Sequence, residues 1–242
     1  MNQQEYTSPV VQMTDVSKIF GTNEHRTAAV RNVSLRASCG ELVLLLGPSG
    51  SGKTTLLTLA AGLVKPTSGT VSLFGKDVES HAPGELQRLR ALRIGFVFQN
   101  FHLIDSLKVI ENVALVLRFA GKRRAQAKGI ARTLLEKFHV GHLASKFPST
   151  LSQGEKQRVA VARAIANGAE LIIADEPTAS LETKQGFDII RLLHDYAKKQ
   201  NRCVIIASHD LRIVEFSDRV LRLRDGMLTS AEDSYVKTLT TP

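Results

Sequence analysis

Hydrophobic and polar residues alternate near the start of the chain. Two stretches, Val10–Phe20 and Val30–Ala37, show this alternation, and the polar stretch Gly21–Thr27 separates them. Because successive side chains of a strand point to opposite faces, the pattern predicts an antiparallel sheet with one buried face. We therefore expect a β lobe at the N-terminal end.

Short apolar runs replace this alternation further along the chain. Glu41–Leu46 ends in glycines, and the leucines of Lys53–Leu63 recur at helical spacing, which predicts a buried strand leading into a helix. By the same criteria, more strands are expected at Thr70–Phe74, Ile94–Phe98, Leu171–Ala174, Cys203–Ala207 and Arg219–Leu223, and more helices at Val109–Arg118, Arg124–Phe138, Val159–Ala166 and Glu182–Lys199. Apolar strands joined by a crossover helix are typical of parallel sheets.

This order of elements predicts a single α/β domain over residues 1–242. A helical subdomain is expected at about residues 100–165, and a loose tail at about residues 229–242. With 43% hydrophobic and 23% charged residues, the chain can bury a core, which excludes disordered and fibrous proteins. The longest apolar runs fall far short of the ~20 residues that cross a bilayer, so the chain is not expected to form a channel.

The start of the chain and its cysteines indicate a compartment. Met1–Pro9 shows no basic cluster followed by an apolar stretch, so no secretory leader is expected and the cytoplasm is the expected location. Cys39 and Cys203 lie far apart without the spacing of a zinc site, which favours reduced structural thiols.

The positive charge leaves several kinds of partner open. The chain has 32 Lys and Arg against 23 Asp and Glu, a formal net charge of +9, which suits nucleic acid, an anionic membrane surface or a polyanionic ligand. Solvated helix faces would produce the same groups of basic residues, and the absence of interleaved aromatic residues favours that interpretation. The basic groups are Arg88, Arg90, Arg93 and Lys122, Arg123, Arg124, Lys128, Arg132.

A glycine-rich turn between a predicted strand and a predicted helix carries the first chemistry. It matches G-x-x-x-x-G-K-[ST] in full, as Gly47, Pro48, Ser49, Gly50, Ser51, Gly52, Lys53 and Thr54. Backbone N–H groups there can bind a polyphosphate, and Lys53 would neutralise its charge. The Thr54 hydroxyl is the expected Mg²⁺ ligand, with Thr55 as its neighbour, because this cation prefers hard oxygen atoms. The motif predicts nucleotide binding in a P-loop NTPase core.

Two carboxylates follow the buried strand Leu171–Ala174, at the sheet edge where open α/β folds bind ligands. Asp175 is expected to hold Mg²⁺, and Glu176 to orient or deprotonate the water that attacks the γ-phosphate. A strand simply leaving the core would give the same pattern, but the upstream phosphate motif favours catalysis.

Leu151, Ser152, Gln153, Gly154 and Glu155 precede a predicted helix, and here the sequence resembles the ATPase subunit of an ABC transporter. That family has an LSGGQ-type signature at this place, from which Gln153 and Glu155 depart. The resemblance implies that Ser152 and Gly154 grip the γ-phosphate of ATP bound to a second ATPase subunit. Ser152 and Glu155 also fit a capping box, which is compatible with that role.

The resemblance extends from about Val10 to Met227 and assigns four more side chains. It implies that Gln99 contacts Mg²⁺ or the attacking water and that His209 binds the γ-phosphate. It places Phe20 against adenine, although the family usually has tyrosine there and a core strand residue is the alternative. Glu182 stands where the family has an aspartate that serves communication across the dimer.

The resemblance also implies partners. It predicts a Mg²⁺-dependent ATPase that dimerises on ATP and drives a separate membrane permease from the cytoplasmic face, of the lipoprotein-releasing or macrolide-exporter type. Phe101, Leu103, Ile104 and Leu107 suit a groove for the permease, although subdomain core is the alternative. An ATPase acting on nucleic acid and an ATP-gated scaffold with little turnover stay open; the single cassette without sustained heptads argues against the first, so no nucleic acid is expected.

Overall fold

The computed structural model describes residues 9–21, 26–82 and 84–229. It separates into two compact units, one of residues 1–83 and 194–242 and the other of residues 84–193, which we call the first and the second unit. The expected tail after Thr229 lies outside the described residues, and so do residues 1–8, where no secretory leader is expected.

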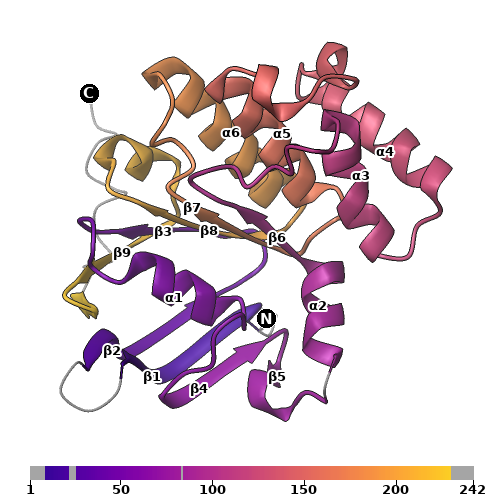
Figure 1. The fold of residues 1–242 in the computed structure, drawn as a ribbon. Coiled ribbons are helices and arrows are strands. Elements are labelled where there is room, and N and C mark those ends of the chain that lie inside the picture. The colour runs from indigo at the N-terminus through magenta and orange to yellow at the C-terminus, as the bar shows by residue number, and fades with distance from the viewer. Residues whose placement is uncertain (1–8, 22–25, 83, 230–242) are drawn as a thin grey trace, which may run out of the picture. The chain divides into compact units, whose positions relative to one another are not determined.

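The first unit contains an antiparallel sheet in the order β2-β1-β4-β5 (Figure 1). Val11 pairs with Ala37 on one side and with Leu73 on the other, and all three side chains are buried. This sheet is the β lobe expected from the alternating sequence. Its strands are β1 (Val11–Phe20), β2 (Thr27–Ala37), β4 (Ser68–Leu73) and β5 (Lys76–Asp77).

A second, mainly parallel set of strands also belongs to the first unit. β3 (Leu42–Leu46) is buried along its whole length and runs parallel to β8 (Cys203–Ser208) and to β9 (Arg219–Arg224). The short β10 (Met227–Thr229) pairs antiparallel with β9. Strands buried on both faces read as continuous apolar runs, which is why the sequence predicted them without alternation.

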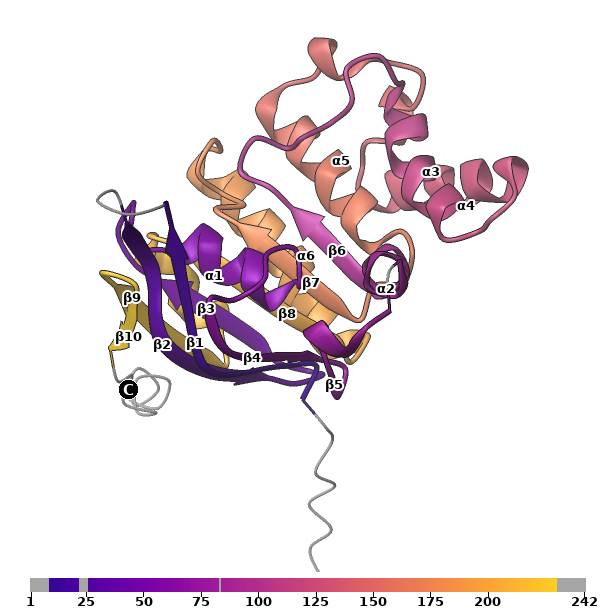
Figure 2. The same cartoon turned by 60° about the horizontal axis from the view of Figure 1, so that its bottom comes forward.

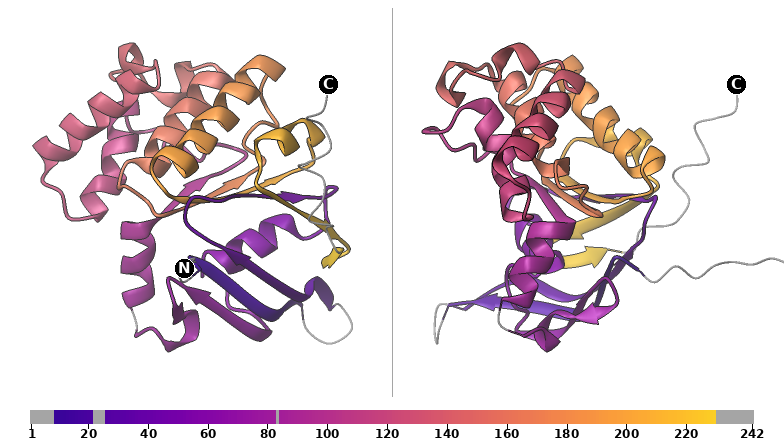
Figure 3. Two further views of the ribbon diagram at one scale, coloured as in Figure 1. Left: turned by 180° about the vertical axis from the view of Figure 1, so that it is seen from behind. Right: turned by 90° about the vertical axis from the view of Figure 1, so that its right-hand side faces the viewer.

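The second unit joins two parallel strands to a group of helices. β6 (Ile94–Val97) pairs with β7 (Leu171–Asp175). α3 (Val109–Phe119) lies beside α4 (Arg124–Lys137) and also contacts α5 (Figures 2 and 3). The remaining elements of the chain are α1 (Lys53–Ala60), α2 (Glu85–Arg93), α5 (Gln153–Ile165), α6 (Thr183–Lys199) and the 3-10 turns Val78–Ser80, Gly141–Leu143, Pro148–Thr150 and Leu211–Phe216.

β6 and α5 meet at their backbones. A Cβ atom on Gly95 of β6 would lie 2.0 Å from the carbonyl oxygen of Ala164 on α5. Real Cβ atoms do not approach that closely, so only glycine allows this strand to lie against this helix. The contact matters for the site because Gln99 follows β6 and Ser152 precedes α5.

The structure differs from the sequence-based expectation mainly in short or polar elements. α2 was not predicted as an element, although Leu86, Leu89 and Leu92 recur at a spacing of three; the basic residues between them drew attention instead, and none of the nine residues is buried. α1 ends at Ala60, earlier than the expected Leu63, and Gly62 follows with a left-handed φ of 62°. In the described ranges, no helix is both long and apolar enough to cross a membrane.

Candidate functional site

The glycine-rich turn of the first unit connects β3 to α1, as its sequence predicts. Gly52 precedes α1 with a φ of 101°, and a Cβ atom there would lie 2.2 Å from the carbonyl oxygen of Ala29 on β2. Gly50 has open space around it but a φ of 79°, which also favours glycine. Both glycines therefore allow a backbone conformation that a residue with a side chain rarely adopts.

Lys53 and Ser51 supply buried polar groups inside this turn. The Lys53 ammonium donates to the carbonyl oxygens of Gly47 at 2.7 Å and Pro48 at 3.0 Å, and the residue is only 6% exposed. The Ser51 hydroxyl is buried and has no hydrogen-bond partner within the described residues. A buried cation and a buried hydroxyl in a loop of backbone donors fit a phosphate group. Thr54 and Thr55 follow in the first turn of α1.

His209 lies at the end of the strand next to this turn. Leu46 pairs with Ser208 in the parallel β3–β8 register, and the backbone N–H of Gly47 donates to the Ser208 carbonyl at 3.2 Å. The structure therefore brings the exposed His209 beside the phosphate turn, at the carboxyl ends of two neighbouring strands. The carboxylate of Asp210 binds Arg212, whose hydrogen bonds lower the pKa of Asp210.

Phe20 is an exposed residue and not a core strand residue. It ends β1, its side chain is 44% exposed, and the Lys18 ammonium lies 5.2 Å from its ring centroid. Exposure leaves the ring face available for stacking on a flat ligand.

The second unit brings Gln99 and the two carboxylates to one sheet edge. Val97 pairs with Ala174 in the parallel β6–β7 register, so Gln99 and Asp175 follow the carboxyl ends of adjacent strands. Glu176 comes next, partly exposed, with a left-handed φ of 47°. A non-glycine residue rarely adopts that conformation, and such backbone strain is concentrated at functional sites.

The capping box expected at the start of α5 is present. The Glu155 carboxylate accepts from both the backbone N–H and the hydroxyl of Ser152, each at 2.8 Å, and the Ser152 Oγ atom lies 3.4 Å from the Glu155 N–H. The backbone hydrogen bond from Ser152 is the main cause that lowers the pKa of Glu155, followed by the hydroxyl. The Glu155 carboxylate is thus turned into the cap.

Two further contacts fix α5 against the segments that follow Glu176. A Cβ atom on Gly154 would lie 2.4 Å from the Oε1 atom of Gln185 on α6, so the glycine allows a close approach there. The buried Gln157 side chain donates to the Pro177 carbonyl at 2.7 Å. The exposed Glu182 immediately precedes α6.

The sequence did not reveal two side chains that hold the segment after Gln99. Arg163 of α5 donates to the carbonyl oxygens of Phe101 and His102. The buried amide of Asn112 on α3 accepts from the Ile104 N–H at 2.7 Å and donates to the carbonyls of Ile104, Leu107 and Lys108. In the sequence, each of these is a polar residue within a predicted helix, which indicates a side-chain hydrogen bond but does not identify the backbone groups that take part in it.

The predicted residues therefore fall into two groups, each organised by its own unit. The turn from Gly47 to Thr55, with His209 and Phe20, belongs to the first unit, and Gln99, Ser152, Gly154, Asp175 and Glu176 belong to the second. The model of the family described as ABC transporter matches residues 30–179, which include the turn, Gln99, the start of α5 and the carboxylates. The chain belongs to the ABC transporter family.

Two curated relatives show the range of this ABC family. The chain is 38% identical over 222 residues to the lipoprotein-releasing system ATP-binding protein LolD 2 of Caulobacter vibrioides, a match covering 92% of this chain and 97% of the relative. It is 34% identical over 234 residues to the macrolide export ATP-binding/permease protein MacB of Agrobacterium fabrum. That match covers 97% of this chain but only 36% of MacB, so the chain spans about a third of that relative.

A solved structure resembles this ABC protein in fold and sequence. The dimeric ATP-binding cassette MJ0796, in a post-hydrolysis state bound to ADP and Pi, matches with a TM-score of 0.86 and 36% identity, over 92% of this chain and 97% of that one. The expected P-loop α/β fold is confirmed. So is the expected general function: the chain is an ATP-hydrolysing subunit of a transport system.

Proposed function

We propose that this ABC ATPase binds Mg²⁺ and ATP with the residues predicted from its sequence and drives a separate permease by closing as a dimer. The observation that carries the proposal is the phosphate turn beside β8, the strand that His209 follows. Lys53 is buried in this turn, as is the Ser51 hydroxyl, which has no hydrogen-bond partner among the described residues. Gly47 to Thr55 would bind the phosphates, and Phe20 would stack on adenine.

Oxygen donors for Mg²⁺ are available among the proposed ligands Thr54, Gln99 and Asp175. Hydroxyl, amide and carboxylate oxygens are the hard ligands that this cation prefers, so the donor set fits it. When bound, Mg²⁺ neutralises charge on the phosphates. Asp175 and Gln99 lie at the ends of neighbouring parallel strands, which places both donors at one edge.

Hydrolysis needs a base and a group that fixes the terminal phosphate. Glu176 would orient the attacking water and accept its proton, and His209 would hydrogen-bond the γ-phosphate. The left-handed backbone at Glu176 sets this side chain immediately after the buried strand β7.

The start of α5 would bind the γ-phosphate of ATP held by a second ATPase subunit. Ser152 begins α5, and the free N–H groups and positive dipole end of a helix favour an anion. The Ser152 hydroxyl donates to Glu155 in this structure, so it would have to rotate before donating to a phosphate. The dimeric MJ0796 cassette supports a pair of subunits, for which we propose two copies of this chain.

The permease would dock on the segment after Gln99, on the cytoplasmic face of the membrane. Ile104 in this segment is 41% exposed, whereas Phe101, Leu103 and Leu107 are partly buried. The lipoprotein-releasing and macrolide-export relatives support a permease of that type, with export or force transmission as its task.

The substitution Glu176→Gln tests the proposal directly. ATP binding should survive while hydrolysis is lost, so the variant should form a stable dimer with ATP and Mg²⁺. Light scattering after size exclusion would measure the mass with ATP and with ADP, and Glu136→Gln, at an exposed position of α4, is the control for the same loss of charge. A variant that hydrolyses ATP at the normal rate, or that stays monomeric with ATP, would contradict it.

A further inference from the structure

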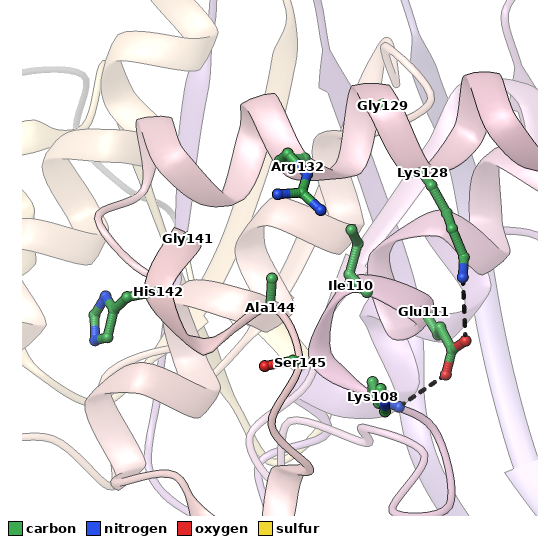
Figure 4. Close-up of a pocket in the computed structure, with 10 residues that line it drawn as sticks. All are labelled: Lys108, Ile110, Glu111, Lys128, Gly129, Arg132, Gly141, His142, Ala144 and Ser145. Atoms are coloured by element: carbon green, nitrogen blue, oxygen red, sulfur yellow. Dashed lines mark hydrogen bonds and ion pairs between the residues drawn. The ribbon is translucent and has the colours of Figure 1, made fainter.

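A surface cavity of about 450 Å³ lies in the second unit (Figure 4). It is bounded by the start of α3, by α4 and by residues 141–145. Backbone hydrogen bonds fasten this last segment to α3, from Ile110 N–H to the Ala144 carbonyl at 3.1 Å and from Val109 N–H to the Lys146 carbonyl at 2.9 Å. The cavity is therefore formed by backbone elements that are tied together. We call it the α3–α4 cavity.

Positive charge dominates its lining. Lys108, Lys128 and Arg132 face a single carboxylate, Glu111, which leaves an excess of two positive charges when His142 is neutral. Glu111 is already engaged twice, by the Lys128 ammonium at 3.5 Å and by the Lys108 backbone N–H at 3.2 Å. These groups, with the Lys108 hydrogen bond first, lower the pKa of Glu111, so it is ionised at neutral pH.

Within the described residues, the Arg132 guanidinium and the Lys108 ammonium pair with no carboxylate, whereas Lys128 pairs with Glu111. The Arg132 side chain extends from α4 toward Ile110 and Ala144 (Figure 4), and it forms no ion pair or side-chain hydrogen bond with any residue in the described part of the chain. Its planar guanidinium can bind two oxygens of one anion at once. The Ser145 hydroxyl also lines the cavity and can donate to the same ligand.

We propose that the α3–α4 cavity binds the phosphate group of a phosphomonoester. Such a group carries close to two negative charges at neutral pH, which matches the charge excess of the lining. The volume of the cavity falls within the range of small-molecule sites, about 300–1,000 Å³. No Phe, Tyr or Trp is among its described lining residues, and Ile110 and Ala144 are its apolar side chains, so it lacks the large apolar anchor pocket that peptide docking uses. None of the lining residues belongs to the proposed ATP-binding or catalytic set.

Binding experiments with the full chain separate this site from the phosphate turn. Calorimetry would use glycerol 3-phosphate as the free probe, and vesicle sedimentation would compare phosphatidylcholine with and without phosphatidic acid. Arg132→Gln should weaken binding roughly tenfold or more, because it removes a charged bidentate donor. Arg124→Gln, the same change elsewhere on α4, and Lys53→Ala, in the phosphate turn, should leave this binding unchanged.

Each outcome decides the proposal. Loss in Arg132→Gln with the free probe assigns a soluble phosphomonoester, and loss only with phosphatidic acid vesicles assigns a lipid headgroup. Equal binding by Arg132→Gln and wild type overturns it. The proposal is also overturned if a glutamate-rich peptide binds and neither glycerol 3-phosphate nor the phosphatidic acid vesicles bind. Unchanged basal ATPase activity of Arg132→Gln would show that the variant is folded, and Arg132→Lys should bind with intermediate affinity if the bidentate geometry matters.

Discussion

Arg163 donates a 2.7 Å hydrogen bond to the carbonyl oxygen of Phe101, two residues after Gln99. A second bond, of 2.5 Å, reaches the His102 carbonyl. Phe101 and His102 both have left-handed φ values, 58° and 47°, which non-glycine residues rarely adopt. The side chain of α5 thus holds a strained turn whose position sets that of Gln99, and burial lowers the pKa of the guanidinium.

Replacing Arg163 should therefore change turnover more than ATP affinity. Arg163→Gln should lower kcat severalfold with little change in KM for ATP, because the phosphate turn lies on other elements. It should also lower the free energy of unfolding by about 1 kcal/mol, since one part-buried and one exposed carbonyl lose a charged donor. Arg163→Lys should recover part of kcat, and Arg124→Gln serves as the control. Parallel losses in kcat and stability for the lysine variant would indicate a purely structural role.

Lys53→Ala should weaken ATP binding by roughly tenfold or more, because a buried cation facing the phosphates is lost. Calorimetry with ATP and Mg²⁺ measures the affinity. Lys65→Ala removes a lysine elsewhere in the same unit and should bind ATP normally. Undiminished affinity in Lys53→Ala would contradict the role proposed for the turn.

The Glu155 cap makes one contribution to stability depend on pH. Its pKa is lowered in the folded chain, so the ionised cap stabilises the protein above the pKa of the unfolded state, near the usual ~4.3. That contribution is lost as pH falls through the lower pKa of the folded state. Glutamine can still accept in the cap, so Glu155→Gln should lower the free energy of unfolding only by about 0.5 kcal/mol at pH 7, and the difference should shrink below about pH 4. Urea unfolding at both pH values tests this; a constant difference would argue against the ionised cap.

Two glycine substitutions should differ sharply. Gly52→Ala places a methyl group against the backbone oxygen of Ala29 at a φ of 101°, so it should destabilise the protein by about 2 kcal/mol or more. Gly154→Ala meets only the end of the flexible Gln185 side chain, which can move, so its cost should stay within about 1 kcal/mol. Thermal unfolding of both variants compares them. Equal shifts in Tm would show that the turn tolerates a side chain at Gly52.

Local sequence was enough to predict the parts of this protein whose physical cause is local. The alternation of Val10–Phe20 and the apolar run before Gly47 predicted strands that the structure contains, and the Ser152 cap followed from its spacing to Glu155. α2 was missed although Leu86, Leu89 and Leu92 recur at a spacing of three, because the nine residues are short of the length at which a periodic pattern stands out.

The contacts of Asn112 and Arg163 show where such reasoning ends. Their partners are backbone carbonyls, which every residue carries, so side-chain chemistry in the sequence does not identify them. The two partners of Arg163 also lie 61 and 62 residues away from it in the sequence. Only the folded chain places these groups within hydrogen-bonding distance.

The contact between Gly95 and Ala164 leaves no compressible side chain between β6 and α5. The strand and the helix should consequently move together as one rigid body, which carries Ser152 before α5 and Gln99 after β6. A displacement of Ser152 would then be transmitted to Gln99 directly, because no side chain between the strand and the helix has to repack first. Gly95→Ala would separate β6 from α5, so the motions of Ser152 and Gln99 should become less strongly coupled even though both side chains are unchanged.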